Sequence, residues 1–203
     1  MALNKIDRAE EYLRFLRDNK TEQDQLYNDM LISVTSFFRD TKSFEVVCTD
    51  VLPGILSRKS AFDPLRIWVA GCASGEEAYT LAICIQEHLG DSAYSRKIQI
   101  FATDISETAI AKARSGIYKQ SELGGLSTQQ ILQFFNKIEG NYQVNKALRD
   151  MCVFAHHNLL KDPPFSNLDL VSCRNVLIYL DPILQKRALS TCLLYTSPSP
   201  RDS

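Results

Sequence analysis

The sequence of 203 residues lacks any apolar run long enough to cross a membrane as a helix, since such a helix needs on the order of 18 apolar residues in succession. It also lacks a secretory signal, because charged side chains are spread through residues 1–20 with no apolar centre between them. We therefore expect a cytoplasmic protein without direct membrane insertion.

Neither sign of charge is in excess, and no cysteine pair has the spacing of a metal site. Lys and Arg number 23 and Asp and Glu number 24, so the net charge of −1 gives no reason to expect a nucleic-acid partner. The six cysteines are scattered without a CxxC pair. They predict reduced, buried thiols rather than a zinc site, because His156 and His157 are adjacent and have no cysteine at ligand spacing.

The stretch RIWVAGCASGEEAYT at residues 66–80 predicts a strand, a glycine turn and a helix in succession. Its apolar run breaks at Gly71 and Gly75, whose backbones can turn tightly and approach a ligand. This order opens an α/β nucleotide-binding unit. Because Glu76 and Glu77 would repel a pyrophosphate at the helix N-terminus, we expect a nucleoside without phosphates. An ordinary turn that binds nothing is the alternative.

A second buried strand, KIQIFAT at residues 97–103, ends in Asp104. An acidic residue at the tip of the second strand is where a carboxylate that binds ribose hydroxyls belongs. The alternative is that Asp104 caps the following helix, a role that Ser106 could fill equally well. The glycine turn and the acid together favour nucleoside binding.

Polar residues follow two further predicted strands, at residues 153–158 and 168–173. Asn158, Arg174 and Asn175 lie at or just past the carboxyl ends of these strands. Ligands bind at that edge of an open parallel sheet, so these side chains extend the candidate site.

The chain divides into segments of different pattern. Residues 1–58 have the apolar spacing of helices, and residues 59–190 have the alternation of an α/β domain. Residues 117–150 interrupt that alternation with a glycine pair, a short helix and a hairpin, and we interpret them as an inserted subdomain. Residues 191–203 lose the periodicity and become rich in Ser and Pro. They predict a truncated chain with a foreign tail, with a disordered linker as the alternative.

A series of motifs resembles the chemotaxis receptor glutamate O-methyltransferases of the CheR type: SVTSFFRD, AGCASGEEAY, FATDIS with ARSGIY, HNLL, and SCRNVLIYLD. The resemblance runs from about Tyr12 to Leu189. It implies an α/β fold with a doubly wound, Rossmann-like methyltransferase sheet, a small helical domain before it and a small inserted β-subdomain, with the C-terminal strands missing. It also implies S-adenosylmethionine as cofactor and the cytoplasmic domains of chemoreceptors as partners. The motifs are also similar to those of methyltransferase domains fused to a methylesterase in hybrid signalling proteins.

The resemblance implies roles for residues at matching positions. Arg39 and Tyr179 are expected at the site of methyl transfer, where they orient the incoming carboxylate. Glu77 matches the cofactor-binding acid of the glycine turn, and Asp104 matches the ribose-binding one. Ser33 stands where the family commonly has asparagine. The cofactor-binding set implied by the resemblance is Ser33, Thr35, Arg39, Glu77, Asp104, Asn158, Leu159, Arg174 and Asn175, with no metal.

The chemistry of this cofactor agrees with the residues. A sulfonium is positively charged and carries no phosphate, so acids at the glycine turn are tolerated. A glutamate nucleophile has an ordinary pKa of about 4.3 and needs no general base at neutral pH. Arg39 beside two phenylalanines is suited to holding a carboxylate, with a surface salt bridge as the alternative. Two other functions stay open: a cofactor-sensing or docking module without turnover, and a nicotinamide-dependent dehydrogenase, which the missing GxGxxG disfavours.

Overall fold

The structure, a computed structural model, describes residues 6, 8–23, 26, 35–60, 62–94 and 96–194. The chain forms two compact units, residues 1–34 and residues 35–203. In the first unit, helix α1 (Ala9–Asp18) is followed by a helical turn at residues 20–23. The Tyr12 hydroxyl donates to Glu22 Oε1 at 2.8 Å, and Glu22 N donates to Asn19 Oδ1 at 3.1 Å, so Asn19 marks the break between them.

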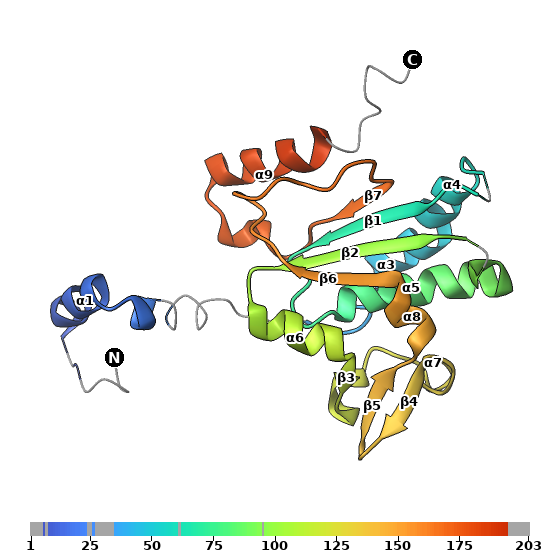
Figure 1. The fold of residues 1–203 in the computed structure, drawn as a ribbon, viewed down its shortest axis with the longest axis horizontal. Coiled ribbons are helices and arrows are strands. Elements are labelled where there is room, and N and C mark those ends of the chain that lie inside the picture. The colour runs from blue at the N-terminus through green and yellow to red at the C-terminus, as the bar shows by residue number, and fades with distance from the viewer. Residues whose placement is uncertain are drawn as a thin grey trace. The chain divides into compact units, whose positions relative to one another are not determined.

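The second unit is built on a parallel sheet of four strands in the order β6-β2-β1-β7 (Figure 1). These strands are β1 (Leu65–Ala70), β2 (Ile98–Asp104), β6 (Cys152–His156) and β7 (Leu170–Ser172). The helices outside the insertion are α3 (Thr41–Val46), η2 (Val47–Val51), α4 (Leu52–Leu56), α5 (Glu76–Leu89), η3 (Gly90–Tyr94), α6 (Glu107–Ser115), η5 (Leu177–Tyr179) and α9 (Pro182–Leu194).

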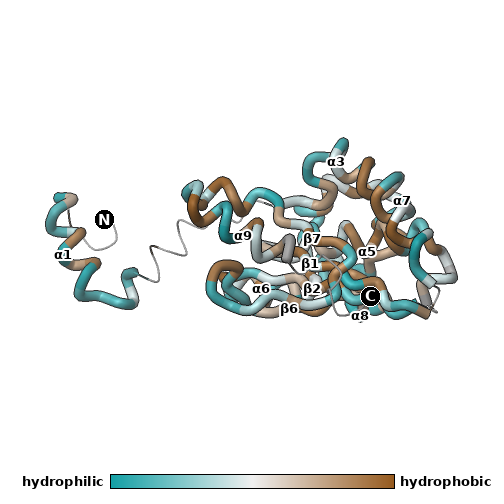
Figure 2. The backbone as a smooth tube through the Cα atoms, turned by 90° about the horizontal axis from the view of Figure 1, so that it is seen from above, coloured by the Kyte–Doolittle hydropathy of each residue, from teal (hydrophilic) through white to brown (hydrophobic). Residues whose placement is uncertain are grey.

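Helices cover both faces of this sheet, because successive residues of a strand point to opposite sides. Ile67 and Val69 of β1 join the larger core with residues of α5 and α6. Trp68 and Ala70 join a second core with Cys192 of α9. Figure 2 shows the sheet between α5 and α9 in the view from above. This arrangement confirms the predicted doubly wound α/β fold.

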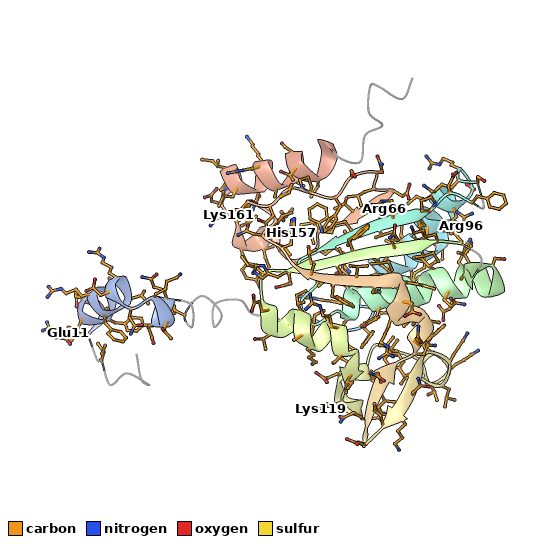
Figure 3. The ribbon with its side chains drawn as sticks, viewed as in Figure 1. Glu11, Arg66, Arg96, Lys119, His157 and Lys161 are labelled. Atoms are coloured by element: carbon orange, nitrogen blue, oxygen red, sulfur yellow. A yellow bond between two sulfur atoms is a disulfide. The ribbon has the colours of Figure 1, made fainter. Side chains whose placement is uncertain are left out.

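The core beneath α9 is built around Trp68, which has 0% exposure and donates from Nε1 to Thr103 Oγ1 at 3.0 Å. Its ring lies edge-on to His157 and Phe165, at centroid distances of 5.5 and 5.4 Å. Phe165 in turn stacks on Phe101. The guanidinium of Arg66, labelled with His157 in Figure 3, lies over the Phe101 ring at 4.7 Å from its centroid.

The insertion forms its own antiparallel sheet in the order β3-β5-β4. Ser127 accepts a hydrogen bond from Gln130 N and caps α7, as its position before a helical pattern favours. The elements are β3 (Ile117–Tyr118), η4 (Gln120–Leu123), α7 (Thr128–Phe134), β4 (Phe135–Ile138), β5 (Asn141–Val144) and α8 (Lys146–Met151).

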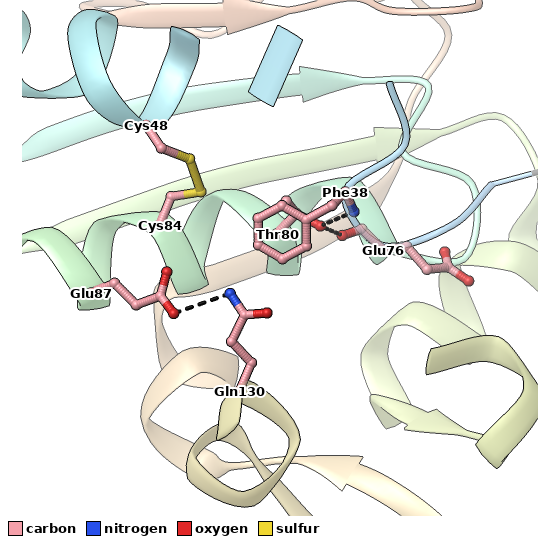
Figure 4. The surroundings of a disulfide bond; sticks show 7 residues. All are labelled: Phe38, Cys48, Glu76, Thr80, Cys84, Glu87 and Gln130. Atoms are coloured by element: carbon pink, nitrogen blue, oxygen red, sulfur yellow. Dashed lines mark hydrogen bonds between the residues drawn. A yellow bond between two sulfur atoms is a disulfide. The ribbon is translucent and has the colours of Figure 1, made fainter. Parts of the chain in front are cut away.

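The prediction of reduced thiols is wrong for Cys48 and Cys84, which form a disulfide (Figure 4). Cys48 lies in η2 and Cys84 in α5, and the packing of these helices brings their Cα atoms to 5.6 Å, within disulfide reach. Cys72, Cys152, Cys173 and Cys192 are free thiols. Burial raises the pKa of the Cys173 thiol to about 12, so it stays protonated at neutral pH. Over the described ranges, no helix is both long and apolar enough to cross a membrane.

Two predicted strands are shorter than their apolar patterns. β6 ends at His156 rather than at residue 158, because Asn158 N donates to Asp162 Oδ2 at 2.7 Å and turns the backbone away from the sheet. β7 spans only Leu170–Ser172 within the predicted 168–173. Both strands still deliver the following polar residues to the carboxyl edge of the sheet.

Candidate cofactor-binding site

The glycine turn between β1 and α5 is fastened to the tip of β2. Gly71 N and Cys72 N both donate to Thr103 O, at 2.7 and 2.9 Å. Gly71 has a φ of 73°, and a Cβ at this position would lie 2.0 Å from Val176 Cγ2. Gly75 has a φ of 96°, and its Cβ would lie 2.9 Å from that of Ala113. The close approach that requires glycine here is therefore to side chains of the protein itself.

Asp104 braces this turn from the end of β2. Its Oδ2 accepts from Ala73 N at 2.8 Å, and its Oδ1 accepts from Ser106 N at 2.9 Å. The cap of α6 is Ser106, whose Oγ accepts from Ala109 N at 3.2 Å. The alternative role of Asp104 as the helix cap is therefore filled by Ser106. Each carboxylate oxygen of Asp104 keeps further acceptor capacity, because a carboxylate accepts about four hydrogen bonds.

Glu77 faces the end of β7. Its Oε1 accepts from Ser172 Oγ, and its Oε2 lies 3.5 Å from Arg174 Nη1. Burial raises the pKa of the Glu77 carboxyl, an effect that the Ser172 hydrogen bond and the charges of Arg174 and Arg39 oppose. A mostly buried carboxylate among donors and cations is thus held at the edge of the sheet.

Arg174 joins the end of β7 to the segment that carries Arg39. Its Nη2 donates to Arg39 O at 2.9 Å and to Asp40 Oδ2 at 2.7 Å. Its guanidinium carbon lies 4.7 Å from the ring centroid of Phe44, in the geometry of a cation–π contact. Arg174 Nη1 is buried and, within the part of the chain that the structure describes, has no hydrogen-bond partner. A buried donor of this kind is costly unless a ligand or water satisfies it.

Glu76 is separate from this edge, although it precedes Glu77 in the sequence. It is 3% exposed and accepts from Ser74 Oγ at 2.8 Å. Tyr118 OH donates to Ser74 O at 2.7 Å, so the same loop is held from the insertion as well. Burial raises the pKa of the Glu76 carboxyl, and the nearby Glu122 adds to this while Lys112 opposes it. Glu76 therefore supports the glycine turn from inside.

Asn158 and Leu159 follow β6 at the same edge of the sheet. Asn158 Oδ1 accepts from Leu160 N at 3.0 Å, which fixes the side chain and leaves its amide nitrogen as a donor. Leu159 packs against the core beneath α9. Asn175 has a φ of 57° and precedes Val176, whose side chain occupies the space over Gly71.

The structure does not bring every predicted residue to one place. Tyr179 lies in η5 with 55% of its surface exposed, and among the described residues no hydrogen bond joins its hydroxyl to the other candidates. Thr35 is the first residue of the second unit. Ser33 lies outside the described residues. Within the described part of the chain, no group of three His, Cys, Asp or Glu side chains could hold a metal ion.

Sequence reasoning missed two residues of the site, Ser172 and Phe44. Ser172 is the last residue of β7 and donates to Glu77, and Phe44 supports the Arg174 guanidinium. Ser172 precedes Cys173 at a predicted strand end, so its position gave a signal. The contact of Phe44 joins residues 130 positions apart and leaves no local pattern.

Comparisons with known proteins place this sequence in a family. The family model described as "CheR methyltransferase, SAM binding domain" matches residues 33–195. An uncharacterized 104.1 kDa protein of Rhodobacter capsulatus is 40% identical over 189 residues, which are 93% of this chain and 20% of that protein. The chemotaxis protein methyltransferase of Borreliella burgdorferi is 34% identical over 84% of this chain and 63% of its own length.

The chemotaxis protein methyltransferase of Salmonella typhimurium is 32% identical, and the match covers 91% of this chain and 64% of that enzyme. The chain thus spans less than two thirds of the length of the chemotaxis methyltransferases it matches. Because the family model covers most of the chain and its residues 33–195 include every described candidate side chain, this chain belongs to the CheR methyltransferases and contains their S-adenosylmethionine-binding domain.

Proposed function

We propose that this chain, within a longer protein, transfers a methyl group from S-adenosylmethionine to glutamate side chains of chemoreceptors. The products are glutamate methyl esters and S-adenosylhomocysteine. One observation carries the proposal: Asp104 at the end of β2, Glu77 in α5 and Arg174 just after β7 all lie at the carboxyl edge of the sheet. That edge is where open α/β sheets bind their ligands.

The chemistry of these side chains fits the cofactor part by part. The spare acceptor capacity of Asp104 suits the two ribose hydroxyls. Glu77 suits the positive charges of the methionine portion, and Arg174 Nη1, which has no hydrogen-bond partner among the described residues, suits its carboxylate. Glu77 at the start of α5 would repel a pyrophosphate. The site therefore favours this nucleoside over a dinucleotide.

S-adenosylmethionine supplies a methyl group on a positively charged sulfur, so the protein has only to place a nucleophile. The substrate glutamate, with an ordinary pKa of about 4.3, is ionised at neutral pH and needs no base. We assign to Arg39 and Tyr179 the orientation of this carboxylate. Such positioning can contribute on the order of 7–11 kcal/mol to the lowering of a barrier. Neither residue should hold the charge tightly, because the ester product is neutral.

The cofactor site is tested by Asp104→Asn, with calorimetric titration of S-adenosylhomocysteine as the readout. We expect the loss of about 1.5–3 kcal/mol of binding free energy, or roughly 10- to 150-fold in affinity, because hydrogen bonds to a charged acceptor are worth that much. Asp150→Asn is the matched control, since this acid is 61% exposed and, among the described residues, pairs only with Lys146. Unchanged affinity in Asp104→Asn, with a normal circular dichroism spectrum, would refute the site.

A second candidate function is a module that binds the cofactor and docks partners without turnover. The observation in its favour is the 104.1 kDa relative, of which the match covers only 20%. Transfer of radiolabelled methyl groups to receptor-containing membranes separates the two functions. Base-labile label on the receptor supports the methyltransferase, and cofactor binding without transfer supports the module.

A further inference from the structure

The segment Phe37–Asp40 has a backbone conformation that the surrounding structure must hold in place. Phe38 has a φ of 50° and Asp40 a φ of 59°, so the residue on each side of Arg39 lies in the left-handed region. Side chains other than glycine rarely adopt that region, and they do so where neighbouring contacts determine it. The contacts that hold this segment therefore also set the position of Arg39.

Aromatic rings of the insertion supply the first of these contacts. Phe37 is 1% exposed. Its ring centroid lies 5.0 Å from that of Tyr118 in β3 and 5.6 Å from that of Phe135 in β4, both edge-on. Edge-on pairs at such distances are favourable beyond the burial of their surface. The side chain before the turn is thus anchored in the inserted subdomain rather than in the helix that follows it.

Gly125 of the same insertion lies directly on the Phe37 backbone. A Cβ at position 125 would lie 1.9 Å from Phe37 O and 2.8 Å from Phe37 C, which no real contact allows. The neighbouring Gly124 has no atom within 4 Å of its own Cβ position. Only one glycine of the pair is therefore required, and the contact that requires it is to the arginine segment.

Helix α5 and the residues after β7 hold the other side of the segment. Phe38 N donates to Thr80 Oγ1 at 3.2 Å, and Thr80 Oγ1 donates to Glu76 O at 2.7 Å, as Figure 4 shows. Arg39 O accepts from Arg174 Nη2 at 2.9 Å. The segment thus lies between the insertion on one side and the cofactor edge on the other.

We propose that the inserted subdomain positions Arg39 for methyl transfer, with Phe37 and Gly125 as the positioning residues. The inference rests on the proposed function, because it takes Arg39 as the residue that orients the substrate carboxylate. Its consequence is that a change in the insertion alters the reaction through the arginine, although none of the described residues assigned to the cofactor edge belongs to the insertion.

Gly125→Ala tests this inference, and Gly124→Ala is its matched control because both add one methyl group to the same loop. Hydrogen exchange of the amides in residues 36–42, followed by mass spectrometry, reports the arginine segment without any assay of activity. We expect at least tenfold faster exchange there in Gly125→Ala and less than a twofold change in Gly124→Ala. Equal exchange in the two variants would overturn the proposal.

The kinetic readout distinguishes positioning from a general loss of structure. We expect Gly125→Ala to lower kcat for methyl transfer at least tenfold, with the affinity for S-adenosylhomocysteine within threefold of wild type. In an Arg39→Ala background the same change should alter kcat less than twofold, because residues that act through one group are not additive. Equal losses of kcat in both backgrounds would contradict a role through Arg39.

Thr80→Val provides a second variant in case Gly125→Ala does not fold. It removes the acceptor for Phe38 N without adding volume, so faster exchange in residues 36–42 is expected again, by a smaller factor. Wild-type protein that neither binds S-adenosylhomocysteine nor transfers methyl groups would refute the proposed function. The exchange measurements would still decide whether the insertion holds the arginine segment.

Discussion

Reduction of the Cys48–Cys84 disulfide should destabilise the second unit strongly. The bridge joins η2 to α5 across a sequence separation of 36 residues. Closing a loop of that length removes about 13 cal/mol/K of chain entropy from the unfolded state, which corresponds to about 4 kcal/mol at room temperature in the loop-entropy description. Domains of ordinary size are stable by about 5–15 kcal/mol. The bridge therefore contributes a large part of the total.

Urea unfolding followed by circular dichroism, with and without dithiothreitol, measures this contribution. With a denaturant slope of about 2 kcal/mol/M, a loss of about 4 kcal/mol lowers the midpoint by about 2 M. Cys48→Ser is the control, because it removes the bridge and should make the midpoint insensitive to the reductant. The Cys84 side chain is 3% exposed and stays buried in that variant.

A thiol titration gives the result that would refute this reasoning. Of the six cysteines in the sequence, the two in the bridge do not react in protein denatured without reductant, so four thiols are expected. Six reactive thiols would exclude the disulfide. An unchanged urea midpoint after verified reduction would instead exclude its stabilising role.

Three further predictions concern single side chains. Burial raises the pKa of the Glu76 carboxyl in the folded state. The protonated carboxyl therefore stabilises the fold below the unfolded-state pKa of about 4.3, and this stabilisation is lost as the pH rises through the folded-state pKa. Glu76→Gln should therefore have a higher urea midpoint than wild type at neutral pH. A difference between the two midpoints that persists near pH 4 would contradict this. Gly75→Ala, with a φ of 96° and a Cβ 2.9 Å from that of Ala113, should cost about 1–3 kcal/mol in thermal unfolding, whereas an unchanged Tm would show that the turn relaxes freely. Asp169→Ala leaves Arg66 N without its acceptor at 2.8 Å, so a loss of about 1–3 kcal/mol is expected in urea unfolding, and a loss below experimental error would argue against it.

Local patterns were sufficient to predict the first strand, the glycine turn and the helix after it. An apolar run, two glycines and an amphipathic restart each depend on neighbours in the sequence. Asp104 was also predictable, because parallel strands bring their carboxyl ends to one edge. The close contact of Gly71 with the side chain of Val176 was not predictable, because these residues lie far apart in the sequence.

Contacts between distant segments could not be predicted from spacing. The Arg174 side chain donates to Arg39 O, a backbone atom that has no signature in the sequence. The bridge between Cys48 and Cys84 depends on how η2 packs on α5, and the six scattered cysteines gave no preferred pairing. Likewise, Gly124 and Gly125 are equivalent in the sequence, and only the position of Phe37 distinguishes them.

The aromatic cluster beneath α9 contains an intrinsic fluorescent probe of unfolding. Trp68 is the single tryptophan of the chain, and it is fully buried between the sheet and that helix. Intrinsic tryptophan fluorescence will therefore report the core between the four-stranded sheet and α9. The insertion, with Tyr118 and Tyr142, emits only as tyrosine. Comparison of the tryptophan signal with hydrogen exchange in residues 117–150 can thus tell whether the two sheets melt together or one after the other.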